Sequence, residues 1–302
     1  MKPRALTPQA LHEHPLPDVT GGDKEDRGHI LVLAGSREIP GATLLAATAA
    51  LRAGAGKLTI ATAASIATGT AFSVPESRTI ALNENIDGAI AVLDKRSEDK
   101  LACLNGKVDA VLVGPGMQNE TTCAAIAHRI AAIFPDTPLV LDAYAMSAVQ
   151  AYRFSIAPVL TPHAGEMAHL TGISKEAILA DPTTAALQAA RQWNAIVILK
   201  GATTVIASPD GPCWRHVADN TGLATSGSGD VLAGIIGGLA ARGLPLLSAA
   251  LWGVVLHAQA GAQLSSRYGP LGYLARDISA VIPDVLGVVS QGLNYTGLAT
   301  IK

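Results

Sequence analysis

Short, mostly apolar runs that alternate with segments of helical periodicity constrain the fold of this chain more than any other feature. Residues 29–35 form one such run, residues 42–53 carry apolar side chains at helical spacing, and residues 57–61 form the next run. This order is typical of a β-α-β unit, in which a helix connects two parallel strands. Since strands that are apolar on both faces lie inside a covered sheet, the pattern predicts a buried, mostly parallel sheet.

The same alternation continues along the chain. We expect strands over residues 108–113, 138–142, 157–161 and 195–199, and helices near 121–134, 182–193, 230–241 and 246–265. The runs at 204–208 and 213–217 surround a Pro209-Asp-Gly turn, which predicts an antiparallel hairpin at one edge of the sheet. The predicted fold class is therefore α/β, a three-layer sandwich with a mostly parallel central sheet.

The domain organisation follows from where the pattern starts. Residues 1–28 are polar and rich in Pro, Asp and Gly, so we expect a loosely structured N-terminal lead-in and an ordered fold that begins at His29. No linker, repeat or shift in composition interrupts the rest of the chain. We therefore expect residues 29–302 to form a single domain.

Composition limits the classes of partner. Hydrophobic residues make up 49% of the 302 residues and charged residues 15%, and the formal net charge is −2 with no basic run. Nucleic-acid binding is not expected, and a small-molecule partner is. The N-terminus lacks the apolar region of a signal peptide, and the most membrane-like window, residues 244–264, is interrupted by Pro245 and His257, so we expect a cytoplasmic protein without a membrane partner.

The three cysteines do not suggest a metal centre. Cys103, Cys123 and Cys213 are odd in number, far apart, and show neither C-x-x-C nor Cys/His zinc spacing. We expect free or buried thiols in a reducing compartment, with no disulfide and no structural metal.

A glycine-rich turn before a helix is the strongest functional signal. Ser226-Gly-Ser-Gly-Asp230 precedes the apolar helix, and glycine lets the backbone come close to a ligand. The free N–H groups of Gly227, Ser228 and Gly229 and the positive end of the helix dipole would bind a phosphate. We expect that field to hold Asp230 ionised, ready to take a proton from a hydroxyl beside the phosphate. The alternative is an aspartate that merely stabilises the first turn.

Several other strand ends carry polar or glycine residues, where ligands of open α/β sheets bind. They are Gly35-Ser36, Pro40-Gly-Ala42, Gly114-Pro-Gly116, Asp142, His163 and Lys200. Lys200 would meet a phosphate or, the simpler interpretation, reach solvent. His163 would position a ligand or cap the next helix, and Asp142 would hold a metal through water or act as a cap.

Together these motifs resemble the ribokinase-like C-terminal type of the YjeF proteins, the ADP/ATP-dependent NAD(P)H-hydrate dehydratases. The resemblance rests on segments in the family's order between residues 24 and 286: Leu31-Val-Leu-Ala-Gly-Ser36, Pro40-Gly-Ala42, Val113-Gly-Pro-Gly116, Leu139-Val-Leu-Asp-Ala143, Leu160-Thr-Pro-His-Ala-Gly-Glu166, Leu199-Lys-Gly-Ala202 and Ser226-Gly-Ser-Gly-Asp230.

The resemblance implies an enzyme that restores hydrated NADH or NADPH (NADHX, NADPHX) at the expense of ADP or ATP, with Mg²⁺ assisting. It implies Asp230 as the catalytic residue and a homo-oligomer, commonly a tetramer. Contacts to the hydrated dinucleotide are implied for Ala42, Gly116, His163 and Asp230. Contacts to the nucleotide are implied for Lys200, Gly201, Ala202, Thr203, Thr204 and Gly229. Many relatives also carry an N-terminal epimerase domain, for which 302 residues leave no room, so we expect no epimerase activity.

Two departures and two alternatives stand beside this prediction. Asp142-Ala-Tyr-Ala-Met-Ser147 replaces the family's Asp-Ala-Asp-Ala-Leu-Asn, and Lys24-Glu-Asp26 replaces Lys-Gly-Asp. A small-molecule kinase such as a hydroxyethylthiazole kinase would use the same Gly-x-Gly-Asp turn. A nucleotide-binding regulator without catalysis would not need Asp230 as a base.

Overall fold

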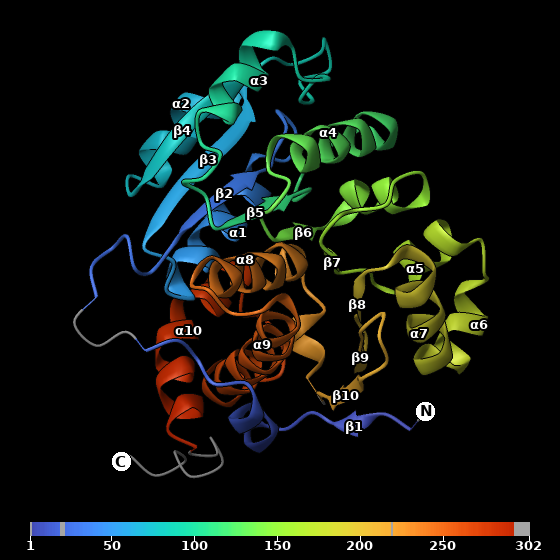
Figure 1. Cartoon of the computed structure of the whole chain (residues 1–302). Helices are drawn as coiled ribbons and strands as arrows, with labels where there is room; N and C mark the ends of the chain where they lie inside the picture. The colour runs from blue at the N-terminus through green and yellow to red at the C-terminus, as the bar shows by residue number, and fades with distance from the viewer. Residues whose placement is uncertain (1, 19–21, 219, 293–302) are drawn as a thin grey trace.

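A computed structural model describes residues 2–18, 22–218 and 220–292, and shows one ten-stranded sheet with helices on both faces (Figure 1). The strands are β1 (Arg4–Ala5), β2 (His29–Leu33), β3 (Lys57–Ala63), β4 (Ser77–Leu82), β5 (Ala110–Val113), β6 (Leu139–Leu141), β7 (Val159–Leu160), β8 (Ile196–Leu199), β9 (Thr203–Ala207) and β10 (Cys213–Val217). The α-helices are α1 (Pro40–Arg52), α2 (Ala64–Ser73), α3 (Lys95–Ala102), α4 (Glu120–Ile133), α5 (Ala164–Thr171), α6 (Lys175–Ala180), α7 (Pro182–Trp193), α8 (Ser228–Ala241), α9 (Leu246–Tyr268) and α10 (Ala275–Ser290). Short 3-10 helices are η1 (Pro8–Glu13), η2 (Ala143–Gln150) and η3 (Thr221–Leu223).

The sheet has the strand order β1-β10-β9-β8-β7-β6-β5-β2-β3-β4. Neighbouring strands are parallel except for the pairs β8/β9 and β9/β10, which are antiparallel. The prediction of a mostly parallel sheet with an antiparallel hairpin is confirmed. The outermost strand beside that hairpin is β1, which pairs in parallel with β10.

The two faces of the sheet belong to two separate cores, as the alternation of side chains along a strand requires. On β2, Ile30 and Val32 pack into the core with α1, α8, α9 and α10, while Leu31 and Leu33 pack into the core with α3, α4, α5, α6 and α7. In Figure 1 the two groups of helices enclose the sheet from opposite sides. The three-layer sandwich is confirmed.

The expectation that the ordered fold begins at His29 is wrong for the first residues. Arg4 and Ala5 pair with Trp214 and Arg215 of β10. Leu6 and Leu11 are 3% and 2% exposed, because they pack into the core beside α9. Isolated leucines among polar residues carry no periodicity, so the sequence did not reveal this contact. The division into a lead-in (1–28) and one domain (29–302) stays a prediction, and residues 1, 19–21, 219 and 293–302 of it lie outside the described residues.

Other elements were not predicted because their patterns are mixed. Strand β4 alternates exposed and buried side chains beside a strand that is buried throughout. Helix α10 contains Pro283, a residue that normally ends a helix. No helix in the described part of the chain is long and apolar enough to cross a membrane. The cysteines are free, with Cys103 exposed and the other two buried.

The backbones of helices α8 and α1 lie very close together, with no side chain between them at Gly234 and Gly238. A Cβ atom added to Gly234 would lie 2.2 Å from the carbonyl oxygen of Ala46, and one added to Gly238 would lie 2.4 Å from that of Ala50. Both glycines are therefore required for the close approach of the two helices. This packing fixes the position of α8, whose N-terminus forms part of the site described next.

Candidate active site

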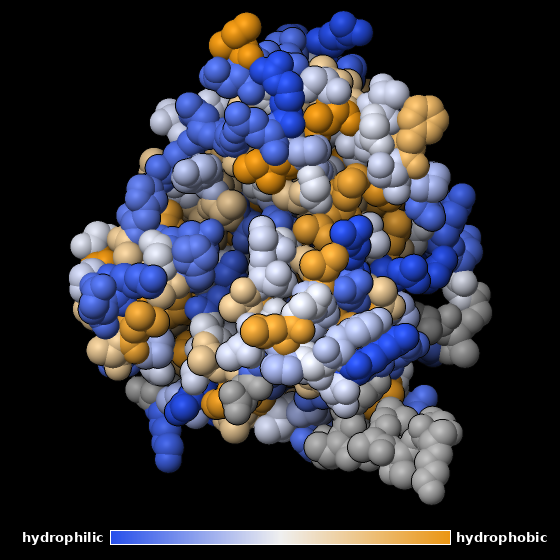
Figure 2. All heavy atoms as spheres, turned by 180° about the vertical axis from the view of Figure 1, so that it is seen from behind, coloured by the Kyte–Doolittle hydropathy of each residue, from blue (hydrophilic) through white to orange (hydrophobic). Residues whose placement is uncertain are grey.

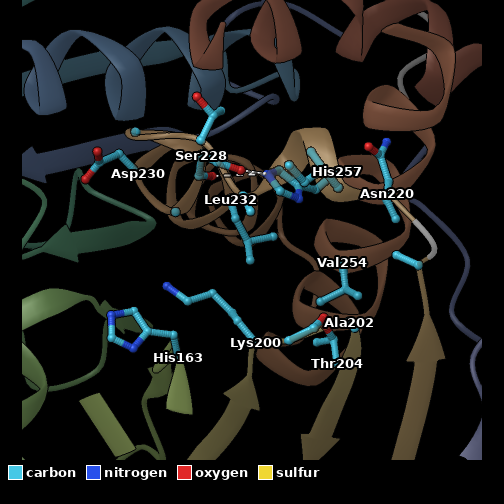
Figure 3. Close-up of a pocket in the computed structure, with 18 of the residues that line it drawn as sticks. His163, Lys200, Ala202, Thr204, Asn220, Ser228, Asp230, Leu232, Val254 and His257 are labelled. Atoms are coloured by element: carbon cyan, nitrogen blue, oxygen red, sulfur yellow. Dashed lines mark hydrogen bonds between the residues drawn. The ribbon is translucent and has the colours of Figure 1, made fainter. Parts of the chain in front are cut away.

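A cavity of about 690 Å³ lies at the carboxyl ends of the central strands, below the start of α8 (Figure 3). Nine of the predicted site residues line it: His163, Lys200, Gly201, Ala202, Thr204, Gly227, Ser228, Gly229 and Asp230. They come from the ends of β7 and β8, the start of β9 and the start of α8. The structure thus brings together, in one cavity, residues that are separated by up to 67 positions in the sequence.

Three predicted site residues do not line this cavity: Ala42, Gly116 and Thr203. Ala42 and Gly116 lie against each other, since a Cβ added to Gly116 would lie 2.7 Å from that of Ala42. The same helix α1 reaches the glycine-rich turn one helical turn later, where Leu45 Cδ1 would be 2.5 Å from a Cβ on Gly227. Ala42 and Gly116 are therefore neighbours of each other on the α1 side of the site, but they are not among the residues that line the cavity.

The glycine-rich turn leaves the start of α8 open. Gly227 is the N-cap residue with φ 87°, a left-handed conformation that favours glycine, and no side chain caps the helix. The first amides of a helix have no intrahelical acceptors, so they are available to an anion. The prediction of a free Ser228 amide is wrong, because this N–H donates a hydrogen bond of 3.2 Å to the Thr225 carbonyl oxygen.

Lys200 lies beside this turn and not in bulk solvent. Its side chain is 21% exposed, and its Nζ is 3.9 Å from Asp142 Oδ1 and 3.9 Å from Glu166 Oε2. A Cβ atom on Gly229 would be 3.2 Å from the same nitrogen. The simpler interpretation, a lysine reaching solvent, is wrong. In Figure 3 the ammonium points into the space between His163 and Asp230.

Asp230 differs from the prediction in its charge. The pKa of Asp230 is raised to about 7, mainly by burial and next by the negative charge of Asp142, with Lys200 opposing both and Glu166 adding a smaller increase. The helix N-terminus favours a carboxylate by about 0.3–1 kcal/mol, which is too little to offset this environment. The expectation that the helix field alone holds Asp230 ionised is therefore wrong. A pKa near neutrality is suited to a general base.

His163 both caps a helix and presents a donor to the cavity. Its Nδ1 accepts hydrogen bonds from the amides of Gly165 (3.0 Å) and Glu166 (3.1 Å) at the start of α5. The ring proton must therefore be on Nε2. The side chain is 59% exposed and Nε2 lies 3.6 Å from Glu166 Oε2, beyond hydrogen-bond distance, so this N–H can still donate to a ligand. The two alternatives from the sequence, a ligand contact and a cap, are compatible.

Asp142 is held inside the site and does not act as a cap. Its side chain makes no capping bond to the helix that follows, and its carboxylate accepts a hydrogen bond from the Thr161 hydroxyl. The residue is 4% exposed. Ala143 next to it has φ 49°, a strained conformation for a residue with a side chain, of the kind found at functional sites.

Among the cavity-lining residues that were not predicted, Asn220 and His257 stand out for their hydrogen bonds. Asn220 accepts hydrogen bonds through Oδ1 from the Gly222 amide and from the hydroxyls of Ser265 and Tyr273, so it ties the turn to α9 and to the segment before α10. His257 of α9 contacts Ser228. Asn220 opens the motif in the sequence, and His257 is a polar residue within an apolar helix. Either feature was a usable signal.

Magnesium is the one metal that the resemblance implies. Among the described residues, no group of three or more His, Cys, Asp or Glu side chains is placed to bind a metal directly. Asp142 and Glu166 nevertheless both face the Lys200 ammonium at 3.9 Å. This acidic pair suits a hydrated Mg²⁺ that is held mainly by nucleotide phosphates.

Comparisons with known proteins agree with this site. A model of the NAD(P)H-hydrate dehydratase family matches residues 30–284. The ADP-dependent (S)-NAD(P)H-hydrate dehydratase of Xanthomonas campestris is 47% identical over 96% of this chain and 98% of the relative. The crystal structure of the Bacillus subtilis ADP/ATP-dependent NAD(P)H-hydrate dehydratase, co-crystallised with ATP/Mg²⁺, has a TM-score of 0.80 at 29% identity, covering 96% of this chain and 99% of that one. A ribokinase-like protein of Enterococcus faecalis has a TM-score of 0.81 at 23% identity, covering 95% and 96%, which confirms the ribokinase-like fold. The chain belongs to the NAD(P)H-hydrate dehydratase family.

Proposed function

We propose that this protein uses ADP or ATP to dehydrate NADHX and NADPHX to NADH and NADPH, as a hydro-lyase of metabolite repair. Family membership supports the reaction. One observation in the site carries the proposal most directly: Asp230, with a pKa raised to about 7, lies in the same cavity as Lys200 and the open start of α8. A base, a cation and an anion-binding turn are the groups that phosphoryl transfer to an alcohol requires.

The proposed chemistry has two steps. The Asp230 carboxylate takes the proton of the C6 hydroxyl of the hydrated nicotinamide, and that oxygen attacks the terminal phosphorus of the nucleotide, releasing AMP from ADP or ADP from ATP. The lone pair of the ring nitrogen then expels phosphate. Loss of a proton from the neighbouring ring carbon restores the dihydronicotinamide. In this scheme the amides of Gly227 and Gly229 stabilise the charge on the transferring group.

The ligand-binding roles are proposals on the same basis. Lys200, Gly201, Ala202, Thr203, Thr204 and Gly229 would bind the nucleotide, and Ala42, Gly116, His163 and Asp230 would bind the hydrated dinucleotide. The open start of α8 and Lys200 Nζ support the first assignment for Gly229 and Lys200. The proton on Nε2 of the exposed His163 side chain supports its assignment to the substrate. Mg²⁺ would supply charge neutralisation at the phosphates, with Asp142 and Glu166 as partners through water.

A homotetramer in the cytoplasm completes the proposal. The surface offers exposed apolar side chains, including Phe72 at 83% and Ile86 at 91% exposure. Figure 2 shows apolar side chains interspersed with polar ones on one face. Static light scattering after gel filtration tests the assembly, and a monomeric mass would contradict it.

The decisive experiment supplies NADHX with ADP or ATP and follows the absorbance of recovered NADH together with the phosphorus NMR spectrum. We expect NADH, inorganic phosphate and AMP or ADP in equal amounts, without an accumulating phosphomonoester. A small-molecule kinase would instead leave a stable phosphate ester of a thiazole or sugar alcohol and would not act on NADHX. A nucleotide-binding regulator would consume no nucleotide.

A further inference from the structure

His257 of α9 contacts Ser228, the first residue of α8, in the same helical turn that carries Asp230 (Figure 3). Its Nε2 is 3.0 Å from the hydroxyl oxygen of Ser228 and 3.1 Å from the carbonyl oxygen of the same residue. Both His257 and Ser228 line the cavity. The proposed reaction has so far assigned no role to this imidazole.

The two distances determine which atom carries the ring proton. A carbonyl oxygen can only accept, so the contact at 3.1 Å is favourable only when Nε2 carries the hydrogen. Burial lowers the pKa of His257 to about 4, and the Lys200 charge opposes protonation as well, against the raising effect of the bond to Ser228. The imidazole is therefore neutral near neutral pH, with its single proton on Nε2.

This assignment leaves the Ser228 hydroxyl free to donate. Since the Nε2–H group lies between the carbonyl and the hydroxyl oxygen, Ser228 Oγ accepts from His257, and its own hydrogen points elsewhere. The Ser228 amide already donates to Thr225. The hydroxyl is thus the group that Ser228 can offer to an anion in the cavity.

We propose that His257 is a positioning residue, which holds the Ser228 hydroxyl as a hydrogen-bond donor to the transferring phosphoryl group. The inference rests on the proposed function, because that function places a phosphoryl group at the start of α8. A hydroxyl with a fixed orientation stabilises developing charge without having to rotate during the step. His257 itself acts through Ser228.

The test compares two substitutions of His257 that place an amide nitrogen at different depths. In His257→Gln the side-chain amide reaches the position of Nε2, while in His257→Asn it ends near the position of Nδ1. We expect His257→Gln to keep kcat within about threefold of the wild type. We expect His257→Asn to lower kcat about 10- to 100-fold with little change in KM for NADHX, below the 10²–10³-fold loss typical of deleting an oxyanion donor.

A double-mutant cycle with Ser228→Ala separates the possible outcomes. Ser228→Ala alone should lower kcat by a similar factor, and adding His257→Asn to it should cause no further loss. Multiplicative losses in the double variant, or equal losses in His257→Asn and His257→Gln with both proteins folded by circular dichroism, overturn the role of His257 but leave the proposed function intact. Full kcat in Ser228→Ala overturns the role of its hydroxyl, and with it that of His257, but not the role of the Gly227 and Gly229 amides, while absence of any NADHX turnover in the wild type rejects the proposed function itself.

Discussion

Replacing Asp230 with asparagine should abolish turnover and stabilise the protein at the same time. The folded protein holds the Asp230 proton up to about pH 7, whereas the ordinary pKa of aspartate is 3.8. The stability associated with that proton is fully present below about pH 3.8 and is lost as the pH rises through about 7. At 1.36 kcal/mol per pH unit, the cost of the buried carboxylate at pH 8 is about 4 kcal/mol. Because Asp230 is only half-buried, solvent screening should reduce this cost to about 2–4 kcal/mol.

Asparagine keeps the shape of the side chain but carries no charge, so it avoids this cost. With an unfolding entropy of about 2.1 cal/mol/K per residue, the variant should melt about 3–6 °C higher than the wild type at pH 8. The gain should shrink as the pH falls below 7 and nearly disappear close to pH 4. Turnover should fall by at least about 10²–10⁴-fold, the usual contribution of a general base.

Differential scanning calorimetry between pH 4 and 8 measures the stability, and titration calorimetry with ADP shows whether the nucleotide still binds. Asp210→Asn, in the exposed turn between β9 and β10, is the matched control and should change neither property. A variant that is no more stable than the wild type at pH 8 would refute the burial argument. Near wild-type turnover would refute the role of Asp230 as the base.

Three further predictions concern the ionisation of Asp230, the charge of Lys200 and the packing of helix α8. In the wild type, kcat/KM should rise with pH and reach half of its plateau near pH 7, since Asp230 must be deprotonated to act; a flat profile from pH 5.5 to 8.5 would contradict this. Lys200→Ala should weaken ADP binding by up to about 3 kcal/mol in a calorimetric titration, and should move the pH profile to higher pH, because the lysine lowers the pKa of Asp230. Gly234→Ala should destabilise the protein by at least about 2 kcal/mol in urea unfolding, since its Cβ would lie 2.2 Å from the Ala46 carbonyl oxygen. The matched control is Gly287→Ala, a helical glycine with open space around it, which should be neutral or stabilise the protein by up to about 1 kcal/mol.

The sequence predicted those parts of the fold in which local pattern and packing agree. Strands β2, apart from His29, and β8 consist of apolar residues and are buried on both faces, so their sequence pattern directly indicates their environment. Strand β1 has two residues and depends on its contact with β10, and nothing in its own sequence encodes that contact. A short segment that is ordered by pairing with a strand distant in the sequence therefore cannot be predicted from its own periodicity.

The same distinction holds for the site, where the residue types could be identified from the sequence but the contacts formed on folding could not. The polar residues of the site could be identified from the sequence, and three of them, His163, Lys200 and Asp230, line one cavity. The charge state of Asp230 could not be predicted from the sequence, because it depends first on how far folding buries the carboxyl group and then on how close Asp142, Lys200 and Glu166 come to it. The contact between His257 and Ser228 likewise joins two helices that the sequence treats separately.

The missing side chains of Gly234 and Gly238 bear on catalysis as well as on packing. Helix α8 rests on the backbone of α1, so it has no room to slide along its axis or to rotate when a ligand arrives. The amides at its start therefore occupy their final positions before any phosphate is present, and no free energy is spent on reorienting them as charge develops. If the cavity closes during turnover, the movement must come from its other walls, which include the end of β8, the start of β9 and residues 220–225.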